Sequence, residues 1–241
     1  MKETLFIVMP CYNEQENIEN VVRNWIPLLD GKSDSSRLLV ADSGSTDSTN
    51  SILKKLQSEF CQLEILSDTQ KQHGPKVIAL YKKAIENNAD YIFQTDSDGQ
   101  TNPAQFNSFW EMRNQYDAII GHRKIRGDGK SRAFVEKVVC FLLKIYFGVK
   151  VPDANAPFRL MKSSLVAKYI SRFDSNYNLP NIMLTTWFSF YKENITFKTI
   201  TFNPRQGGKN SINIRKIFKI GVKALFDFKE FKKEMKKGIQ K

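Results

Sequence analysis

The sequence predicts an α/β protein with a mostly parallel sheet that is covered by helices on both faces. Two observations lead to this fold class. Short apolar runs typical of buried strands alternate four times with stretches of helical spacing. Three of these runs are followed at once by clusters of polar residues. Such an alternation favours parallel strands joined by crossover helices.

The first half of the chain gives the regular part of this pattern. We expect strands over residues 5–9, 37–42, 63–66, 91–95 and 117–121, and helices over residues 17–29, 46–60, 75–87 and 103–115. Ser45 or Thr46 is the expected cap of the second helix, because a side-chain oxygen there can accept a backbone N–H. Pro75 suits the first turn of the third helix.

The second half is less regular. We expect helices near residues 132–147, 164–171 and 180–192, then a strand over 195–202 and a glycine-containing loop at 205–211. The run FVEKVVCFLLKIYFGV at 134–149 is interrupted by charged residues, so it predicts an amphipathic helix and not a membrane span. No internal repeat or low-complexity linker is present.

Composition places the chain among ordinary globular proteins of a reducing compartment. A chain of 241 residues buries enough surface to fold without disulfides. Its three cysteines are too far apart for a zinc pattern, and their odd number suits reduced thiols. The N-terminal apolar run is too short for a secretory signal, and no segment has about 18 apolar residues. We therefore expect a cytoplasmic protein.

The net charge of +12 is concentrated in the tail. Residues 212–241 hold ten Lys or Arg and three Asp or Glu, a net charge of +7, so we divide the chain into a domain at 1–211 and a basic helical tail at 212–241. The tail's apolar residues have nearly helical spacing: Ile214, Ile217, Phe218, Leu225, Phe228, Phe231 and Met235. Such a helix can remain free in solvent, dock on its own domain, or lie on an anionic membrane with the helix near 134–147 as a further contact. The last case would make the protein peripheral on the inner membrane face.

The three polar clusters lie where a parallel sheet binds ligands, at the carboxyl ends of its strands. They follow the first, second and fourth expected strands, at residues 10–14, 42–45 and 96–100. In the third cluster, Asp96 and Asp98 lie on the same side of an extended chain and repel each other. A divalent cation would remove that conflict, and so would a turn in which each carboxylate caps a backbone amide.

Three motifs in register resemble those of family-2 glycosyltransferases, which have the GT-A fold. They are VMPCYNEQENI at 8–18, VADSGSTDST at 40–49 and QTDSDGQ at 94–100. The subgroup of dolichol- and polyprenyl-phosphate sugar synthases is the most similar. Its later motifs correspond here to GHR at 121–123, DANAPFR at 153–159 and RQGGKNS at 205–211. The resemblance covers about residues 4–211 and is strongest up to Arg123.

The resemblance implies a metal site and a nucleotide site. Asp96, Asp98 and Gln100 would hold Mg²⁺ or Mn²⁺, which neutralises the charge of a departing nucleoside diphosphate. The nucleotide-binding residues it implies are Pro10, Tyr12, Glu14, Asp42, Ser43 and Asp96. Glu14 has an equal alternative as a first-turn helix acid. Ser43 stands where the family often has a second aspartate, which leaves the choice between UDP and GDP open.

The acceptor side follows from the later motifs. An acceptor hydroxyl needs a general base, for which Asp153 is the candidate. A phosphate acceptor is already ionised and needs none, and then Arg123, Arg132 and Arg205 become the expected phosphate ligands, with ordinary surface arginines as the alternative. Ala156-Pro157 replaces the family's Ser-Gly, which changes the backbone freedom near the acceptor.

The function implied is metal-assisted, inverting transfer of a sugar from a UDP- or GDP-linked donor to a polyprenyl-phosphate or glycan acceptor. Two other classes stay open on the residues alone. A basic membrane- or nucleic-acid-binding module would use the tail and keep the acidic loops as structure, although no nucleic-acid motif is present and no nucleic-acid partner is expected. A nucleotidyltransferase would carry a glycine-rich basic loop near its N-terminus, where VMPCYNEQENI has neither glycine nor lysine.

Overall fold

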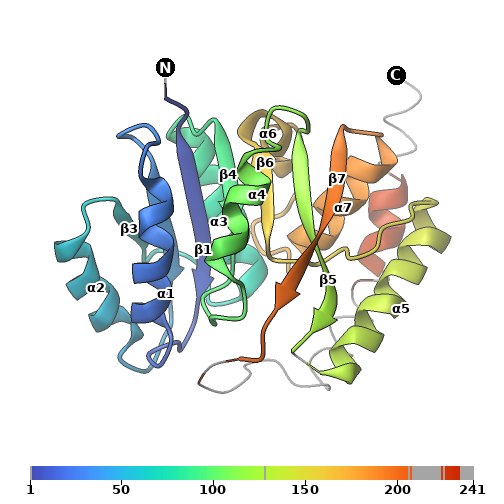
Figure 1. Cartoon of the computed structure of the whole chain (residues 1–241). Helices are drawn as coiled ribbons and strands as arrows, with labels where there is room; N and C mark the ends of the chain where they lie inside the picture. Colours follow the sequence, from blue (N-terminus) through green and yellow to red (C-terminus); the bar gives the residue numbers. More distant parts are fainter. Residues whose placement is uncertain (1, 128, 206, 208–223, 225, 234–241) are drawn as a thin grey trace.

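A seven-stranded sheet forms the centre of the computed structural model (Figure 1). The structure describes residues 2–127, 129–205, 207, 224 and 226–233. The strand order is β3-β2-β1-β4-β6-β5-β7, and only β6 runs antiparallel to its two neighbours. The predicted fold class, a mostly parallel sheet with helices on both faces, is confirmed.

The strands are β1 (Leu5–Cys11), β2 (Arg37–Asp42), β3 (Leu63–Leu66), β4 (Tyr91–Gln94), β5 (Ala118–Arg126), β6 (Arg159–Lys162) and β7 (Ile195–Phe202). The helices are α1 (Ile18–Trp25), α2 (Thr49–Glu59), α3 (His73–Glu86), α4 (Phe106–Trp110), α5 (Lys130–Phe147), α6 (Ser163–Ile170) and α7 (Pro180–Phe190). Short 3₁₀ turns extend α1 at Ile26–Leu29 and precede α4 at Pro103–Gln105.

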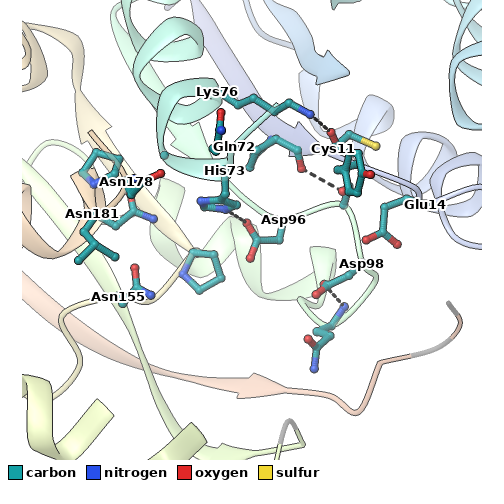
Figure 2. Close-up of a pocket in the computed structure, with 18 of the residues that line it drawn as sticks. Cys11, Glu14, Gln72, His73, Lys76, Asp96, Asp98, Asn155, Asn178 and Asn181 are labelled. Atoms are coloured by element: carbon teal, nitrogen blue, oxygen red, sulfur yellow. Dashed lines mark hydrogen bonds and ion pairs between the residues drawn. The ribbon is translucent and has the colours of Figure 1, made fainter. Parts of the chain in front are cut away.

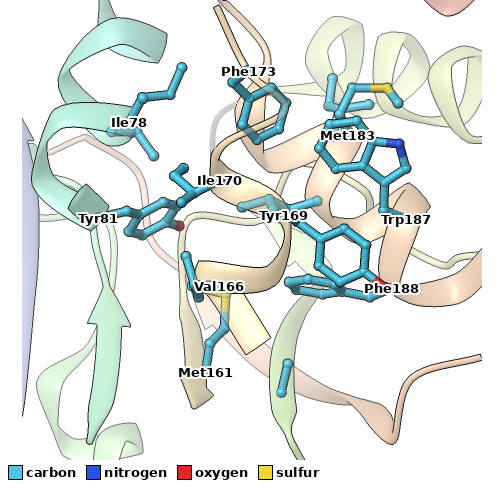
Figure 3. Close-up of a cluster of buried hydrophobic side chains, with 14 of the residues drawn as sticks. Ile78, Tyr81, Met161, Val166, Tyr169, Ile170, Phe173, Met183, Trp187 and Phe188 are labelled. Atoms are coloured by element: carbon cyan, nitrogen blue, oxygen red, sulfur yellow. The ribbon is translucent and has the colours of Figure 1, made fainter. Parts of the chain in front are cut away.

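The alternating side chains of β1 divide the core into two clusters, one on each face of the sheet. Phe6 and Val8 pack with α3, α6 and α7, whereas Leu5, Ile7 and Met9 pack with α1, α2 and α4. Figure 3 shows the first cluster, in which Tyr169, Phe173 and Trp187 form a ring-rich centre between α6 and α7. Both faces are thus covered, as a parallel sheet requires.

Several sequence predictions need correction in detail. β6 was not predicted, because four residues beside a loop give too short a period to detect. The helix expected over 103–115 is a 3₁₀ turn followed by the five-residue α4. Helix α2 begins at Thr49, and neither Ser45 nor Thr46 caps it. Asp47 instead accepts a hydrogen bond from the Thr49 backbone N–H at 3.0 Å.

The sequence predicted a strand that ends before Pro10. In the structure, Pro10 lies inside β1. It is opposite Ala41 of β2, whereas the pairing of β1 with β4 extends only from Leu5 to Val8. The missing N–H of Pro10 therefore falls where β1 has a neighbour on one side only, a position that tolerates proline. The Pro10 carbonyl accepts a hydrogen bond from the Ser97 hydroxyl at 2.9 Å, which ties the end of β1 to the loop after β4.

The described part of the C-terminal tail packs on the domain. Residues 226–233 are helical, and Phe228 is only 2% exposed. The Phe228 ring lies 5.6 Å from that of Phe147, and the Phe231 ring lies 5.3 Å from that of Trp187. Docking on its own domain is therefore observed for this segment. Most of the predicted tail helix, including Ile214, Ile217, Phe218 and Met235, lies outside the described residues, and the domain boundary at 211 stays a prediction.

Candidate active site

A cleft of about 650 Å³ opens at the carboxyl ends of β1 and β4 (Figure 2). Its lining includes most of the predicted site residues, namely Pro10, Tyr12, Glu14, Asp96, Asp98, Gln100, Arg123, Arg132 and Arg205. Three predicted residues do not line it: Asp42, Ser43 and Asp153. The structure thus brings the first and third polar clusters together with arginines from three later segments of the chain.

Side-chain hydrogen bonds join the loop after β1 to the loop after β2. Asn13 has a φ of +54°, a conformation that asparagine tolerates better than most residues. Its side-chain oxygen accepts from the Thr46 backbone N–H at 2.8 Å, and its own N–H donates to the Ser45 hydroxyl at 3.0 Å. This fixes the position of Tyr12 and Glu14 on either side of Asn13, at the edge of the cleft.

Asp98 and Asp96 form a carboxylate pair in the centre of the cleft. Burial, followed by the charge of Asp96, raises the pKa of Asp98 to about 7. One Asp98 oxygen accepts from the Gln100 backbone N–H at 3.1 Å, and the other lies 3.7 Å from an Arg205 nitrogen. Gly99, between Asp98 and Gln100, has a φ of +72°, which the tight turn requires. Asp96 lies beside His73, with 3.3 Å between His73 Nε2 and Asp96 Oδ1.

The donor set at this pair suits a hard cation. Asp96 and Asp98 repel each other, and the buried amide of Gln100 follows two residues after Asp98. Carboxylate and amide oxygens are ligands that Mg²⁺ and Mn²⁺ take. The Gln100 side-chain nitrogen donates to the Asn203 carbonyl at 2.8 Å, so the amide oxygen is the atom left for a ligand. Among the residues that the structure describes, no three His, Cys, Asp or Glu side chains gather into a metal site. Asp96 and Asp98 would therefore supply part of a coordination shell, which leaves positions for phosphate oxygens.

Glu14 and Arg205 form an ion pair at one side of the cleft, across 191 positions of the sequence. Their closest atoms are 2.5 Å apart, and Asn17 donates to the other Glu14 oxygen at 2.8 Å. Burial raises the pKa of Glu14 against these favourable contacts. Glu14 lines the cleft, and its contact with a nucleotide stays a prediction. The alternative as a first-turn helix acid is wrong, because Glu14 precedes α1 and the acid in the first turn of that helix is Glu19.

Asp42 and Ser43, the predicted nucleoside contacts, lie beside the cleft and form hydrogen bonds with other residues of the protein. Asp42 is 3% exposed and accepts from the Ser45 hydroxyl at 2.5 Å and from the Asn50 amide at 3.2 Å. The Ser43 hydroxyl contacts that of Thr69, and the Ser43 carbonyl accepts from Lys76 at 3.0 Å. Their contact with a nucleoside stays a prediction.

Lys76 was missed by the sequence reasoning and lines the cleft from the first turns of α3. It is 1% exposed, and its ammonium group donates to the carbonyls of Cys11 and Ser43 at 2.5 and 3.0 Å. Burial lowers its pKa. It also lies 5.5 Å from the centre of the Tyr12 ring, and Lys71 lies 4.8 Å from it. These two lysines place positive charge on the Tyr12 side of the cleft. The signal for them in the sequence was the polar stretch KQHGPK, which precedes a helical pattern.

On the opposite side of the cleft, Asp153 is held by Arg123 in a buried, two-point ion pair. Arg123 donates from Nε and Nη2 to the two Asp153 oxygens, each at 2.8 Å, and its backbone N–H donates to the same carboxylate at 3.2 Å. Burial acts to raise the pKa of Asp153, but the hydrogen bonds and charge of Arg123 hold it below its usual range. Glu136 of α5 adds a 3.4 Å contact to Arg123 and accepts from Ala154 N–H at 2.8 Å. Both oxygens of Asp153, the predicted general base, thus bind Arg123 and orient its guanidinium group.

Three asparagine side chains line the same part of the cleft: Asn155, Asn178 and Asn181. Figure 2 shows them grouped across from Glu14 and Asp98, with Asp96 and His73 between the two sides. Asn181 is 2% exposed, and its carbonyl accepts from the fully buried Arg159 at 3.2 Å. Arg159 also donates to the Ala156 carbonyl at 2.7 Å, so it fixes the 154–156 loop against the start of α7. Amide groups in this position can hydrogen-bond sugar hydroxyls.

The family model for glycosyl transferase family 2 matches residues 6–233 of this chain. The chain therefore belongs to glycosyl transferase family 2 and carries a glycosyltransferase domain. Similar proteins include the undecaprenyl-phosphate mannosyltransferase of Micrococcus luteus, 26% identical over 65% of this chain and 65% of that protein. Another is the UDP-N-acetylglucosamine–dolichyl-phosphate N-acetylglucosaminyltransferase of Methanococcus voltae, 27% identical over 66% of this chain and 70% of that protein. The chain spans about two thirds of the length of these relatives.

Solved structures confirm the GT-A fold. Glucosyl-3-phosphoglycerate synthase from Mycobacterium tuberculosis, in complex with Mn²⁺, UDP-glucose and glycerol 3-phosphate, superposes with a TM-score of 0.64 at 18% identity. The match covers 90% of this chain and 76% of that one. At this identity the likeness concerns the fold alone.

Proposed function

We propose that this protein transfers a sugar from a UDP- or GDP-linked donor to a polyprenyl phosphate, with the help of Mg²⁺ or Mn²⁺. The observation that carries the proposal is the carboxylate pair Asp96–Asp98 at a strand end, facing arginines from three other segments. The names of the Micrococcus and Methanococcus relatives support a lipid-phosphate acceptor. The family match spans the acidic strand ends, so a binding module with merely structural acidic loops and a nucleotidyltransferase are set aside.

The donor half of the reaction depends on Asp96, Asp98 and Gln100. These residues would hold the cation, which supplies charge neutralisation as the nucleoside diphosphate leaves. Tyr12, Lys71 and Lys76 surround the place for the nucleoside and its phosphates, and Asp42 and Ser43 lie behind it. Burial and the charge of Asp96 raise the pKa of Asp98, and a bound cation would offset both effects. Binding of donor and metal is therefore expected to be coupled.

The acceptor half is assigned to Arg123, Arg132 and Arg205. A guanidinium group binds phosphate oxygens at two points, and each of these side chains lines the cleft. Asp153 orients Arg123 and Glu14 orients Arg205, so the two guanidinium groups are fixed before the acceptor arrives. An ionised phosphate attacks the sugar carbon without a general base, which agrees with the commitment of Asp153 to Arg123. A glycan hydroxyl would need a base, and the inverting course of the reaction stays part of this proposal.

Transfer of labelled sugar tests the proposal. The full chain is incubated with UDP-glucose, UDP-N-acetylglucosamine or GDP-mannose, each carrying a labelled sugar, with Mn²⁺ and undecaprenyl phosphate in detergent. We expect label in the organic phase from one donor, with loss on adding EDTA and on omitting the lipid. Label that moves to an added oligosaccharide and never to the lipid would refute the acceptor, and transfer unaffected by EDTA would refute the metal.

A further inference from the structure

Helix α5 turns a row of large apolar side chains toward solvent. Phe134, Val138, Phe141 and Ile145 are 68%, 39%, 60% and 59% exposed, and we call this row the α5 lane. Their spacing of four, three and four residues keeps them on one face of the helix. Of the described residues, five large apolar side chains are exposed, and four of them belong to the α5 lane. The lane is therefore a continuous patch and not scattered exposure.

The orientation of the helix is fixed by what lies on its other side. Leu143 and Phe147 are 0% and 6% exposed and belong to the core cluster that also contains α6 and α7. The Phe147 ring packs against Phe228 of the tail at 5.6 Å. Rotating α5 to bury the lane would expose these residues, so the exposure of the lane is a property of the packed fold.

The charges beside the α5 lane have one sign. Glu136 is the only acidic residue of α5, and it is turned inward, with a side chain that is 12% exposed and bound to Arg123 and to Ala154 N–H. Lys137 and Lys144, one heptad apart, are exposed along one edge of the lane. The outward face of α5 is thus apolar in the middle and cationic at its edge, which is the pattern of a helix that lies on an anionic lipid surface.

Helix α5 begins at the cleft. Arg132, in the first turn of α5, lines the cleft, whereas Phe134, two residues later, lies on the other side of the same turn and begins the α5 lane. In the described part of the tail, Phe228 and Phe231 pack on the domain. Among the large apolar side chains of this described part, Phe226 is the exposed one. Within the described residues, α5 therefore presents the larger exposed apolar surface.

We propose that the α5 lane docks on an anionic lipid surface, with Phe134, Phe141 and Ile145 at the headgroup boundary and Lys137 and Lys144 on the anionic headgroups. The inference extends the proposed function, because a lipid-borne phosphate must reach Arg132 from such a surface. The competing occupant is a second copy of the chain. An antiparallel two-fold contact through the lane would place the lysine edges of two copies near one another, and their like charges oppose that arrangement.

Co-sedimentation of the full chain with vesicles tests the docking. Vesicles of phosphatidylcholine alone are compared with vesicles containing phosphatidylglycerol, at low and high salt. We expect binding to the anionic vesicles at low salt and release by salt. The double variant Phe141→Ser/Ile145→Ser should bind them at least about tenfold more weakly, since two large apolar side chains no longer enter the interface. Lys137→Glu/Lys144→Glu should lose the preference for anionic vesicles.

Phe226→Ser is the matched control, because Phe226 is 64% exposed but lies outside the α5 lane. Binding by Phe141→Ser/Ile145→Ser equal to that of the wild type, or an equal loss in Phe226→Ser, would overturn the proposal. A wild-type dimer in light scattering that becomes a monomer in the lane variant would assign the lane to a second copy. Thermal melts confirm folding, and UDP binding with Mn²⁺ is measured on the same samples. Intact nucleotide binding without vesicle binding refutes the docking alone, whereas absent nucleotide binding refutes the proposed function.

Discussion

The two halves of the sheet build their share of the cleft by different means. In the β3-β2-β1-β4 half, parallel strands deliver the site residues from their carboxyl ends, and short hydrogen bonds between loops hold them, such as that from Ser97 to the Pro10 carbonyl. In the β6-β5-β7 half, the antiparallel β6 interrupts the pattern. There the site residues come from the middle of β5, from α5 and from loops. Ion pairs between largely buried side chains hold them in place.

Different physical causes place the site residues in the two halves. The proposed donor side, in the β3-β2-β1-β4 half, follows from topology, because strand ends on one edge must converge. The proposed acceptor side follows from pairing, because Arg123, Asp153 and Arg159 are buried charges that need partners from distant segments. The donor side should therefore tolerate the loss of the Asp98 charge, which the fold disfavours, whereas the acceptor side should be destabilised by the loss of Arg123.

The largest expected effect is on the acceptor side. Arg123→Ala leaves Asp153 and Glu136 buried beside each other without their cation, and breaking such a pair costs about 3–5 kcal/mol. We expect that loss in the free energy of unfolding, measured by urea denaturation. Removing both Arg123 and Asp153, as Arg123→Met/Asp153→Leu, should recover much of it. A loss below about 1 kcal/mol for Arg123→Ala would show that pairing does not hold this half together.

The contact between the two halves is tested at Gly74. A Cβ there would lie 2.4 Å from the Tyr177 carbonyl oxygen and 2.5 Å from Asn178, so the start of α3 and the 177–178 loop must separate. We expect Gly74→Ala to cost about 1–3 kcal/mol and to weaken nucleotide-sugar binding, because both segments line the cleft. Gly31→Ala is the control: a Cβ there meets nothing within 4 Å, so only the cost of its φ of +75° remains. Equal losses would mean that the close approach is unimportant.

The donor side should become more stable when a site charge is removed. The folded pKa of Asp98, about 7, lies above its ordinary value, so the folded state disfavours the ionised form. The cost is absent below about pH 4, grows as the pH rises to about 7 and is complete above that. Asp98→Asn should therefore stabilise the metal-free protein at pH 8 by roughly 1–4 kcal/mol, the upper figure being the full cost of a rise of about three pKa units, and by nothing at pH 3.5. Thermal melts at the two pH values measure this, and a destabilised variant at pH 8 would contradict it.

The smallest effect concerns the asparagines that face the carboxylate pair. If Asn181 hydrogen-bonds the donor sugar, Asn181→Ala should remove about 1 kcal/mol of binding, or about fivefold, from the nucleotide sugar and nothing from the nucleoside diphosphate. Calorimetry with both ligands measures the difference. Asn178→Ala is the companion variant at a more exposed position. An equal loss for both ligands would assign Asn181 to structure.

The sequence predicted most of the donor side because its signals are local. Strand-end clusters at Pro10–Glu14 and Asp96–Gln100 can be read from apolar runs, and their meeting in one cleft follows from the parallel sheet. Lys76 was missed, because its burial depends on carbonyls of Cys11 and Ser43 that the sequence does not place.

The acceptor side could be predicted by residue type but not by arrangement. The motifs pointed to Arg123 and Asp153 as separate site residues, whereas the structure pairs them, and Glu136 was taken as an interruption of an apolar helix. β6 is four residues long, and Asn155, Asn178 and Asn181 carry no periodic signal. Pairings between positions 13 to 30 residues apart are set by tertiary packing, which single-sequence patterns do not encode.

Calorimetric titration with UDP and with GDP, each with and without Mn²⁺, tests the central claim most directly. We expect one of the two nucleotides to bind only, or at least about tenfold more tightly, when Mn²⁺ is present. We also expect Asp98→Asn to abolish the Mn²⁺-dependent part of the binding while the variant stays folded. Binding of neither nucleotide, or binding that Mn²⁺ and Asp98→Asn leave unchanged, would contradict a metal-assisted nucleotide-sugar site at the Asp96–Asp98 pair.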